Sequence, residues 1–367
     1  MKILIVDDSA LVRSILKHVL VNEKEFFVVG EASNGRQAIE LNTKLEPDFI
    51  IMDIDMPVMD GLEATRRIIH EKKVPILIFS GESSKNIAYK AIDIGAADVM
   101  RKPCIENFND ESFYKSFIKK IHILADKEVS SKPVMPAQES KSKEKKNTCQ
   151  SIKINTFSEK KFFIKSGESK LIKSTLKKQI YKMLVIGAST GGPSSVKKIL
   201  HNLPATFPLG IAVVQHMEKG FDRGFAKWLD EASSLDVRLA EKTEMIQKGK
   251  VVVAPVDKHL IINGDYLMLY DGPKVLNQKP SVDVLFESAA NRFETELIGI
   301  LLTGMGRDGA KGCVSICSKG GLTLVQDKES STIFGMPKAA IDLGGASKVL
   351  SLEEISKFLV KLVTETQ

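Results

Sequence analysis

Three polar residues in the C-terminal half follow apolar runs that are typical of strands. Ser189 stands in "GASTG", a G-x-S-x-G pattern that marks a sharp strand-to-helix turn exposing a serine. His216 ends "GIAVVQH", and Asp308 follows "LIGILLTG". If the three strands are parallel neighbours, their carboxyl ends bring these side chains to one sheet edge. A serine nucleophile, an imidazole base and an acid then predict acyl-transfer hydrolysis.

Each of these motifs has an alternative interpretation. The glycine-rich turn at Ser189 equally suits a phosphate group held by backbone amides at a helix start. "GMGRDG" contains the G-x-G-x-x-G of dinucleotide sites, which belongs in the first strand-to-helix turn of a domain. The first strand here lies in "MLVIGASTGG", so Gly304 and Gly306 favour backbone amides approaching an oxyanion instead. His259 in "APVDKH" is the alternative to His216 as the base.

A second polar group lies in the N-terminal third, again where apolar runs end: Asp7, Asp8, Asp53, Ser80 and Lys102. Clustered carboxylates need a counter-ion, and Mg²⁺ binds such oxygen ligands together with a phosphoryl oxygen. Asp53 can then form an aspartyl phosphate, while Ser80 and Lys102 bind the transferred group. These residues predict a phosphoryl-acceptor site.

The elements that must position both groups alternate between strands and helices. In residues 1–124 five apolar runs, "KILIVDD", "FFVVGEA", "FIIMDID", "PILIFSG" and "ADVMRKP", are separated by helical patterns. The first such pattern has two apolar stripes at i,i+4,i+8 spacing, namely Leu11, Ile15, Val19 and Val12, Leu16, Leu20. We expect two α/β domains, each with a doubly wound parallel sheet, over residues 1–124 and 181–367. If the first has strand order 2-1-3-4-5, its first and third strands are neighbours, and Asp7, Asp8 and Asp53 converge.

The segment between them, residues 125–180, carries the basic charge of the chain. The net charge is +7, and residues 127–178 alone contain 14 lysines and five glutamates. This composition predicts a flexible linker rather than a nucleic-acid surface. A lysine surface for anionic lipid or an acidic partner is the alternative, with Phe157–Gly167 as its docking segment.

The overall composition indicates a soluble globular protein, with 43% hydrophobic and 27% charged residues. No apolar run approaches the roughly 18 residues that span a bilayer, and "MKILIVDDS" meets charges too early for a signal peptide. We therefore expect a cytoplasmic protein without a transmembrane segment. Cys313 and Cys317, spaced i,i+4 with no histidine nearby, favour core packing over metal binding.

The N-terminal third closely resembles the response-regulator receiver family through "VDDS", "DIDMPVMDG", "SG" and "KP". The resemblance implies a flavodoxin-like fold and phosphorylation of Asp53 by a sensor histidine kinase. It also implies Mg²⁺ held by Asp8, Asp53 and the backbone carbonyl of Asp55, with Asp7 as a further carboxylate. Val99 stands where many receivers have an aromatic residue that moves on phosphorylation, so the signal relay is expected to differ in detail.

Residues 182–367 resemble the catalytic domain of the chemotaxis protein-glutamate methylesterases through "IGASTGG", "QHM", "APVDKH", "PSVDVLF", "LTGMGRDGA" and "FGMPKAA". The resemblance implies a Rossmann-like domain that hydrolyses glutamate γ-methyl esters on chemoreceptors, releasing methanol. Some members also deamidate receptor glutamines. The family's catalytic serine, histidine and aspartate fall on Ser189, His216 and Asp308, and its oxyanion amide on Met305. Thr190 matches another active-site position, and the ester chemistry needs no cofactor.

The fusion of a phosphoryl-acceptor domain to a hydrolase predicts regulation, in which the unphosphorylated receiver covers the catalytic edge until Asp53 is phosphorylated. We also expect recruitment to membrane receptor arrays. Two features depart from the family: Glu218 and Lys219 replace common prolines after "QHM", and the linker is long. The alternative function is a DNA-binding two-component response regulator that uses the basic segment. That function predicts a helix-turn-helix output domain, whereas the C-terminal half alternates strands with helices.

Overall fold

The computed structural model describes residues 1–81, 87–103, 108, 110–129 and 181–366. Most of the segment predicted as a linker lies outside these residues. So do Phe157–Gly167, suggested above as a docking segment, and the cysteines Cys104 and Cys149.

The N-terminal domain contains a five-stranded parallel sheet in the order β2-β1-β3-β4-β5, the flavodoxin-like order expected. Its strands are β1 (Lys2–Val6), β2 (Phe27–Ala32), β3 (Phe49–Met52), β4 (Ile76–Ser80) and β5 (Asp98–Arg101). Its helices are α1 (Ala10–Val21), α2 (Gly35–Leu45), α3 (Gly61–Glu71), α4 (Lys90–Ile94) and α5 (Glu111–Val129). Helix α5 thus extends five residues past the boundary predicted at residue 124.

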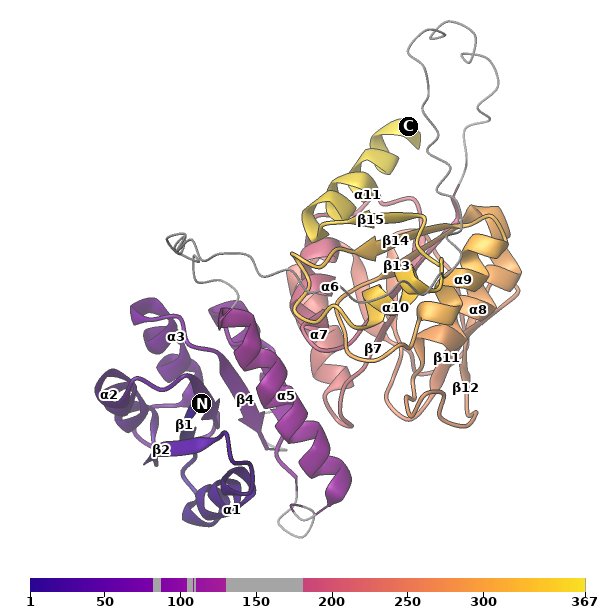
Figure 1. The fold of residues 1–367 in the computed structure, drawn as a ribbon. Helices are drawn as coiled ribbons and strands as arrows, with labels where there is room; N and C mark the ends of the chain where they lie inside the picture. Colours follow the sequence, from indigo (N-terminus) through magenta and orange to yellow (C-terminus); the bar gives the residue numbers. More distant parts are fainter. Residues whose placement is uncertain (82–86, 104–107, 109, 130–180, 367) are drawn as a thin grey trace, which may run out of the picture. The chain divides into compact units, whose positions relative to one another are not determined.

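Helices α1 and α5 pack on one face of this sheet, where a cluster of buried apolar side chains joins them to β1 and β4. Ser9 begins α1 by accepting a hydrogen bond from the Val12 amide. Val12, Leu16 and Leu20 of one predicted apolar stripe of α1 are buried in this cluster together with Val19 of the other, whereas Leu11 is 51% exposed. Helices α2 and α3 lie on the opposite face (Figure 1), which makes the sheet doubly wound.

The C-terminal domain has a seven-stranded parallel sheet in the order β15-β14-β13-β6-β7-β10-β8 and a three-stranded antiparallel sheet, β11-β12-β9. The large sheet consists of β6 (Met183–Ala188), β7 (Gly210–Gln215), β8 (Asp236–Leu239), β10 (Lys250–Val253), β13 (Leu297–Leu301), β14 (Leu322–Gln326) and β15 (Lys348–Leu350). The small sheet consists of β9 (Glu244–Met245), β11 (His259–Asn263) and β12 (Tyr266–Tyr270).

The helices of this domain cover both faces of the large sheet (Figure 1). They are α6 (Gly192–His201), α7 (Asp222–Ala232), α8 (Val282–Phe293), α9 (Ala310–Ser318), α10 (Met336–Asp342) and α11 (Leu352–Thr366), with the short helix η2 (Glu294–Glu296) after α8. Strand β6 is buried on both faces: Val185 packs in the cluster that contains α8, and Ile186 packs in the one that contains α6. Continuous apolar runs are the expected sequence of such central parallel strands.

Strands β13, β6 and β7 are consecutive neighbours in the large sheet and are parallel. Backbone hydrogen bonds continue past their ends, from the Ser189 amide to the Thr303 carbonyl at 3.0 Å and from the His216 amide to the Ala188 carbonyl at 3.0 Å. The residues that follow the three strands therefore share one sheet edge, which is the arrangement the sequence analysis assumed.

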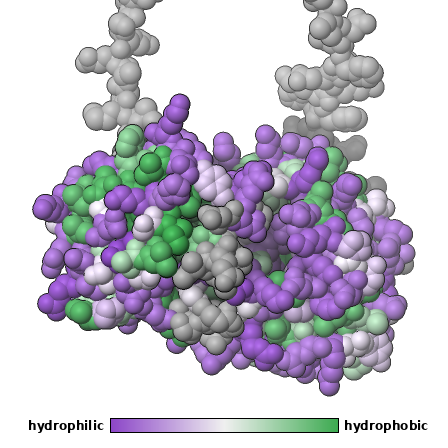
Figure 2. Space-filling view, turned by 90° about the horizontal axis from the view of Figure 1, so that it is seen from below, coloured by the Kyte–Doolittle hydropathy of each residue, from purple (hydrophilic) through white to green (hydrophobic). Residues whose placement is uncertain are grey.

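One face of the described surface is largely polar. Hydrophilic residues cover most of the face shown in Figure 2, with hydrophobic residues in smaller patches between them. No helix in the described part of the chain has both the length and the apolar character needed to cross a bilayer.

Candidate active site and phosphoryl-acceptor site

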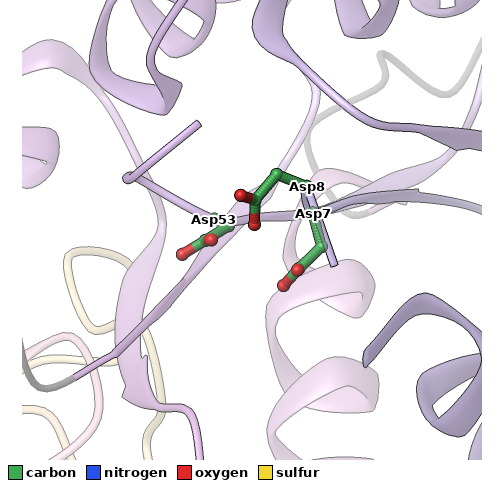
Figure 3. Close-up of side chains that lie close together, drawn as sticks. All are labelled: Asp7, Asp8 and Asp53. Carbon is green, nitrogen blue, oxygen red and sulfur yellow. The ribbon is translucent and has the colours of Figure 1, made fainter. Parts of the chain in front are cut away.

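Three carboxylates meet at the carboxyl ends of β1 and β3. Asp7 and Asp8 follow β1, Asp53 follows β3, and one oxygen from each lies within 4.8 Å of the others (Figure 3). Lys102, which follows β5, places its Nζ 2.7 Å from Asp7 Oδ2 and 2.8 Å from Asp53 Oδ2. The strand order explains this grouping, because β1 and β3 are adjacent in the sheet.

The charges of this cluster favour the binding of a divalent cation. Burial raises the pKa of Asp53 to about 6, while the nearby Lys102 ammonium opposes the rise. Burial also disfavours the charged form of Lys102, but the carboxylates of Asp53 and Asp7 outweigh it and raise the pKa of Lys102. Three carboxylates face one ammonium group, and their hard oxygen donors fit Mg²⁺. Asp55, expected to add its carbonyl, lies in the exposed turn two residues after Asp53.

Two further residues define the surroundings of Asp53. Ser80 is buried at the end of β4, and its hydroxyl donates to the Gly81 carbonyl at 3.3 Å. Gly61 begins α3 directly against Asp53: a Cβ at this position would lie 1.8 Å from the Asp53 backbone oxygen. Only glycine allows the helix to start so close to the acceptor residue.

At the carboxyl edge of the large sheet, the structure brings together the residues predicted for hydrolysis. Ser189 follows β6, His216 follows β7, and Asp308 lies in the loop after β13. His216 Nε2 is 2.8 Å from Asp308 Oδ2. Nδ1 of the same ring has no hydrogen-bond partner among the described residues. Nδ1 is therefore the ring nitrogen that remains for a proton from the serine.

Asp308 is held by the start of α8. Besides His216, four groups donate to its carboxylate: Ser281 Oγ (2.8 Å), the Asp283 amide (3.0 Å) and the Gly309 amide (3.1 Å) to Oδ1, and the Val282 amide (2.7 Å) to Oδ2. The positive end of the helix dipole also favours the anion. Burial alone would raise the pKa of Asp308, but the hydrogen bond from His216 and those from the amides lower it. Asp308 is thus ionised at neutral pH.

Gln215, the last residue of β7, joins the nucleophile to the base. Its Nε2 donates to the Ser189 carbonyl at 2.8 Å and to the His216 carbonyl at 2.9 Å. A Cβ on Gly192 would lie 2.1 Å from Gln215 Oε1, so the glycine leaves space for this side chain. Gln215 was not among the predicted site residues; a buried glutamine ending an apolar strand beside a candidate base was the available signal.

The loop after β13 lies directly against the serine turn. Thr303 is fully buried, and its hydroxyl donates to the Thr190 carbonyl at 3.0 Å. A Cβ on Gly304 would lie 2.7 Å from the Ser189 Cβ, so glycine permits this close approach. Met305 follows immediately, which brings the residue with the expected oxyanion amide next to the serine turn.

The remaining candidates from the sequence have other surroundings. His259, the alternative base, is buried at the start of β11, where it contacts Pro273 and Ser281 rather than Ser189. Cys313 is fully buried in the core cluster that includes α9, and Cys317 Sγ lies 3.1 Å from Thr323 Oγ1. Among the described residues, the only metal-type cluster is the group of three aspartates.

Both domains match families of known proteins. The family model for the CheB methylesterase matches residues 184–359, and that for the response regulator receiver domain matches residues 3–108. A protein-glutamate methylesterase/protein-glutamine glutaminase of Pyrococcus horikoshii is 36% identical, with 99% of this chain and 93% of the relative covered. A second of that name from Methanospirillum hungatei is 36% identical, with 100% and 99% covered.

Among solved structures, the crystal structure of the Thermotoga maritima CheB methylesterase catalytic domain is 42% identical to this chain. The match covers 50% of this chain and 98% of the Thermotoga maritima chain, with a TM-score of 0.48. The full-length relatives match across both domains in the same order. The chain therefore belongs to the CheB methylesterase family and carries a response-regulator receiver domain ahead of its esterase domain.

Proposed function

We propose that this protein demethylates glutamate γ-methyl esters on chemoreceptors, releases methanol, and is activated by phosphorylation of its receiver domain. The observation that carries the proposal is the contact of His216 with Asp308 at 2.8 Å, at the sheet edge where Ser189 follows the neighbouring strand. The names of the full-length relatives support this substrate class. They also support deamidation of receptor glutamines, in which ammonia leaves in place of methanol.

The proposed reaction begins when Ser189 Oγ attacks the ester carbonyl and His216 Nδ1 takes the serine proton. The Met305 amide stabilises the oxyanion of the tetrahedral intermediate. His216 then protonates the methoxy oxygen, and methanol leaves the acyl-enzyme. Water attacks next, with His216 again as base, and the free glutamate and Ser189 are regenerated. Ionised Asp308 orients the imidazole and stabilises its cationic form throughout.

Thr190 has a supporting place in this site. Its carbonyl accepts the hydrogen bond from Thr303, which ties the serine turn to the loop carrying the oxyanion amide. We propose that Thr190 keeps these two segments in register while the acyl-enzyme forms.

In the receiver, we propose that Asp53 accepts a phosphoryl group from a chemotaxis sensor histidine kinase. Asp7, Asp8, Asp53 and the Asp55 carbonyl would hold Mg²⁺, which when bound neutralises phosphoryl oxygens. The Lys102 ammonium and the Ser80 hydroxyl would bind the transferred group. The fusion of this acceptor to a hydrolase supports inhibition by the unphosphorylated receiver and its release by phosphorylation.

These partners imply a place in the cell. We propose that the protein works in the cytoplasm and is recruited to membrane receptor arrays, where both the kinase and the methylated substrate are found.

The test is methanol release from methyl-esterified chemoreceptor by the wild type, Ser189→Ala and Asp53→Asn, each with and without acetyl phosphate and Mg²⁺. We expect release to require Ser189 and to rise with acetyl phosphate only in chains that retain Asp53. Release that persists in Ser189→Ala would overturn the esterase assignment. An equal rise in Asp53→Asn would overturn the regulatory one.

A further inference from the structure

His259 is a fully buried imidazole that the proposed reaction does not use. Its Nε2 lies 2.9 Å from the Pro273 carbonyl oxygen, and the Ser281 amide donates to its Nδ1 at 3.1 Å. An amide N–H can only donate, so Nδ1 must be an unprotonated acceptor. A carbonyl can only accept, so Nε2 must carry the proton. Both neighbours therefore require the neutral Nε2–H tautomer.

The amide that His259 accepts belongs to the residue that caps α8. Ser281 is fully buried, and its hydroxyl accepts a hydrogen bond from the Val284 amide. The preceding residue, Pro280, has no N–H. The Ser281 hydroxyl also donates to Asp308 Oδ1 at 2.8 Å. The His259 imidazole thus accepts the Ser281 amide. The next two amides of the chain, those of Val282 and Asp283, donate to Asp308.

A continuous series of contacts then connects His259 to the reacting groups. It runs from His259 to Ser281, from Ser281 to Asp308 and from Asp308 to His216. Asp308 and His259 are each held from two sides, because Asp308 also accepts from backbone amides and His259 also donates to Pro273. The Tyr270 ring stacks on the His259 ring, with centroids 6.1 Å apart and planes at 29°.

We propose that His259 is a positioning residue of the esterase. By accepting the Ser281 amide it fixes the start of α8 against Asp308, and through Asp308 it fixes the direction of the His216 imidazole. It touches no reacting atom. Losing this acceptor should misalign His216 by a fraction of an ångström, which lowers the rate of acylation more than substrate binding. The proposal rests on the assignment of Ser189, His216 and Asp308 above.

Two substitutions separate the two hydrogen bonds of His259. His259→Asn can place an amide oxygen near the Nδ1 position and keep the acceptor for Ser281. His259→Gln can place an amide nitrogen near the Nε2 position and keep the donor to Pro273. Both are neutral amides that differ by one methylene, so each is the control for the other.

The readout is the rate at which a fluorophosphonate labels Ser189 in the full chain, with Ser189→Ala as the blank. This reaction needs no receptor, so it is independent of the substrate proposed above. We expect His259→Gln to lower the maximal labelling rate about 10- to 100-fold with little change in probe affinity, because misplaced groups lose rates of this order. His259→Asn should stay within about threefold of wild type by the same argument.

Equal rates for the two folded variants, whether fast or slow, would overturn the proposal. The wild type supplies a measurement that does not depend on variant folding, namely the ¹⁵N chemical shifts of the His259 ring. We expect a pyridine-type shift for Nδ1 and a pyrrole-type shift for Nε2 under the conditions of the labelling assay. The opposite tautomer, or an imidazolium in the active enzyme, would contradict the assigned contacts.

Discussion

His216 turns Nε2, not Nδ1, toward Asp308, at a distance of 2.8 Å. Asp308 in turn accepts from the amides of Val282 and Asp283 at the start of α8. The imidazole is therefore oriented by a helix terminus as well as by a single acid. This arrangement makes Asp308 a structural acceptor and a catalytic partner at the same time.

Replacing Asp308 with asparagine should reduce both activity and stability. The new side-chain amide must direct its N–H groups at backbone N–H donors, which reduces stability. It also no longer favours the His216 imidazolium, so kcat should fall by about 10⁴-fold. KM should change little. Methanol release together with thermal unfolding checks this, with Ser189→Ala defining the floor. A variant within tenfold of wild-type kcat would show that Asp308 does not direct His216.

Removing the side-chain amide of Gln215 should slow the reaction without weakening substrate binding. Gln215→Met keeps the volume but loses both donors, to the Ser189 and His216 carbonyls. We expect kcat to drop about 10- to 100-fold, since small displacements of reacting groups have effects of this size. The matched control is Ser195→Ala, which removes a hydrogen bond to the Gly191 carbonyl of the same turn. Equal kcat for both variants would argue against the bridging role of Gln215.

In the receiver, Lys102→Gln should impair phosphorylation. Its ammonium lies 2.7 Å from Asp7 and 2.8 Å from Asp53, and a neutral amide cannot meet the charge of a transferred phosphoryl group. Incorporation of phosphate from acetyl phosphate should slow about 10²-fold, as when one preorganised electrostatic group is removed. Lys72→Gln, which affects only an exposed ion pair with Glu46, is the control. Undiminished incorporation in Lys102→Gln would remove Lys102 from the site.

The carboxyl of Asp283 should make the stability of the catalytic domain depend on pH. Burial, followed by the charge of Asp308, raises the pKa of Asp283 to about 6, above its ordinary 3.8. The folded domain then retains a proton that the unfolded chain has released, so this group reduces stability as pH rises from about 4 to 6. The loss is fully present above pH 6.

Asp283→Asn removes that titration. Between pH 5 and pH 8, the free energy of unfolding of the variant should therefore increase by about 1 to 2 kcal/mol relative to that of the wild type. Urea unfolding followed by Trp228, the single tryptophan of the chain and part of α7, measures the difference. The exposed Asp236→Asn serves as the control. A difference between variant and wild type that is the same at both pH values would contradict a titrating Asp283.

Local patterns in the sequence were enough to predict the strands of the receiver, and their order followed from assuming the flavodoxin-like topology. Parallel βα units allow few topologies, so the polar residues that end β1 and β3 could be placed together before any coordinates were known. The same reasoning applied to Ser189, His216 and Asp308, because each follows a buried apolar run.

The groups that align these residues could not be predicted in the same way. Ser281 reaches Asp308 across 27 residues, and nothing in the local pattern of either segment indicates that they meet. Gln215 resembles any polar residue that ends a strand until its two carbonyl partners are located. His259 looked like a second base because residue type alone does not show which atoms surround it. In α1, periodicity predicted two adjacent apolar stripes, and packing leaves only Leu11 of their six residues exposed.

Strand β6 lies between β7 and β13 in the sheet. During translation, β13 is synthesised more than a hundred residues after β6. While the ribosome works through the intervening chain, β7 can cover one edge of β6, but the other edge stays unpaired. At about 5 to 20 residues per second, this interval lasts roughly 5 to 20 s. A chain whose translation stops in that interval carries Ser189 without Asp308 and exposes a strand edge that chaperones and proteases can bind. Demethylating capacity is thus acquired only after β13 and the loop that carries Asp308 have been synthesised.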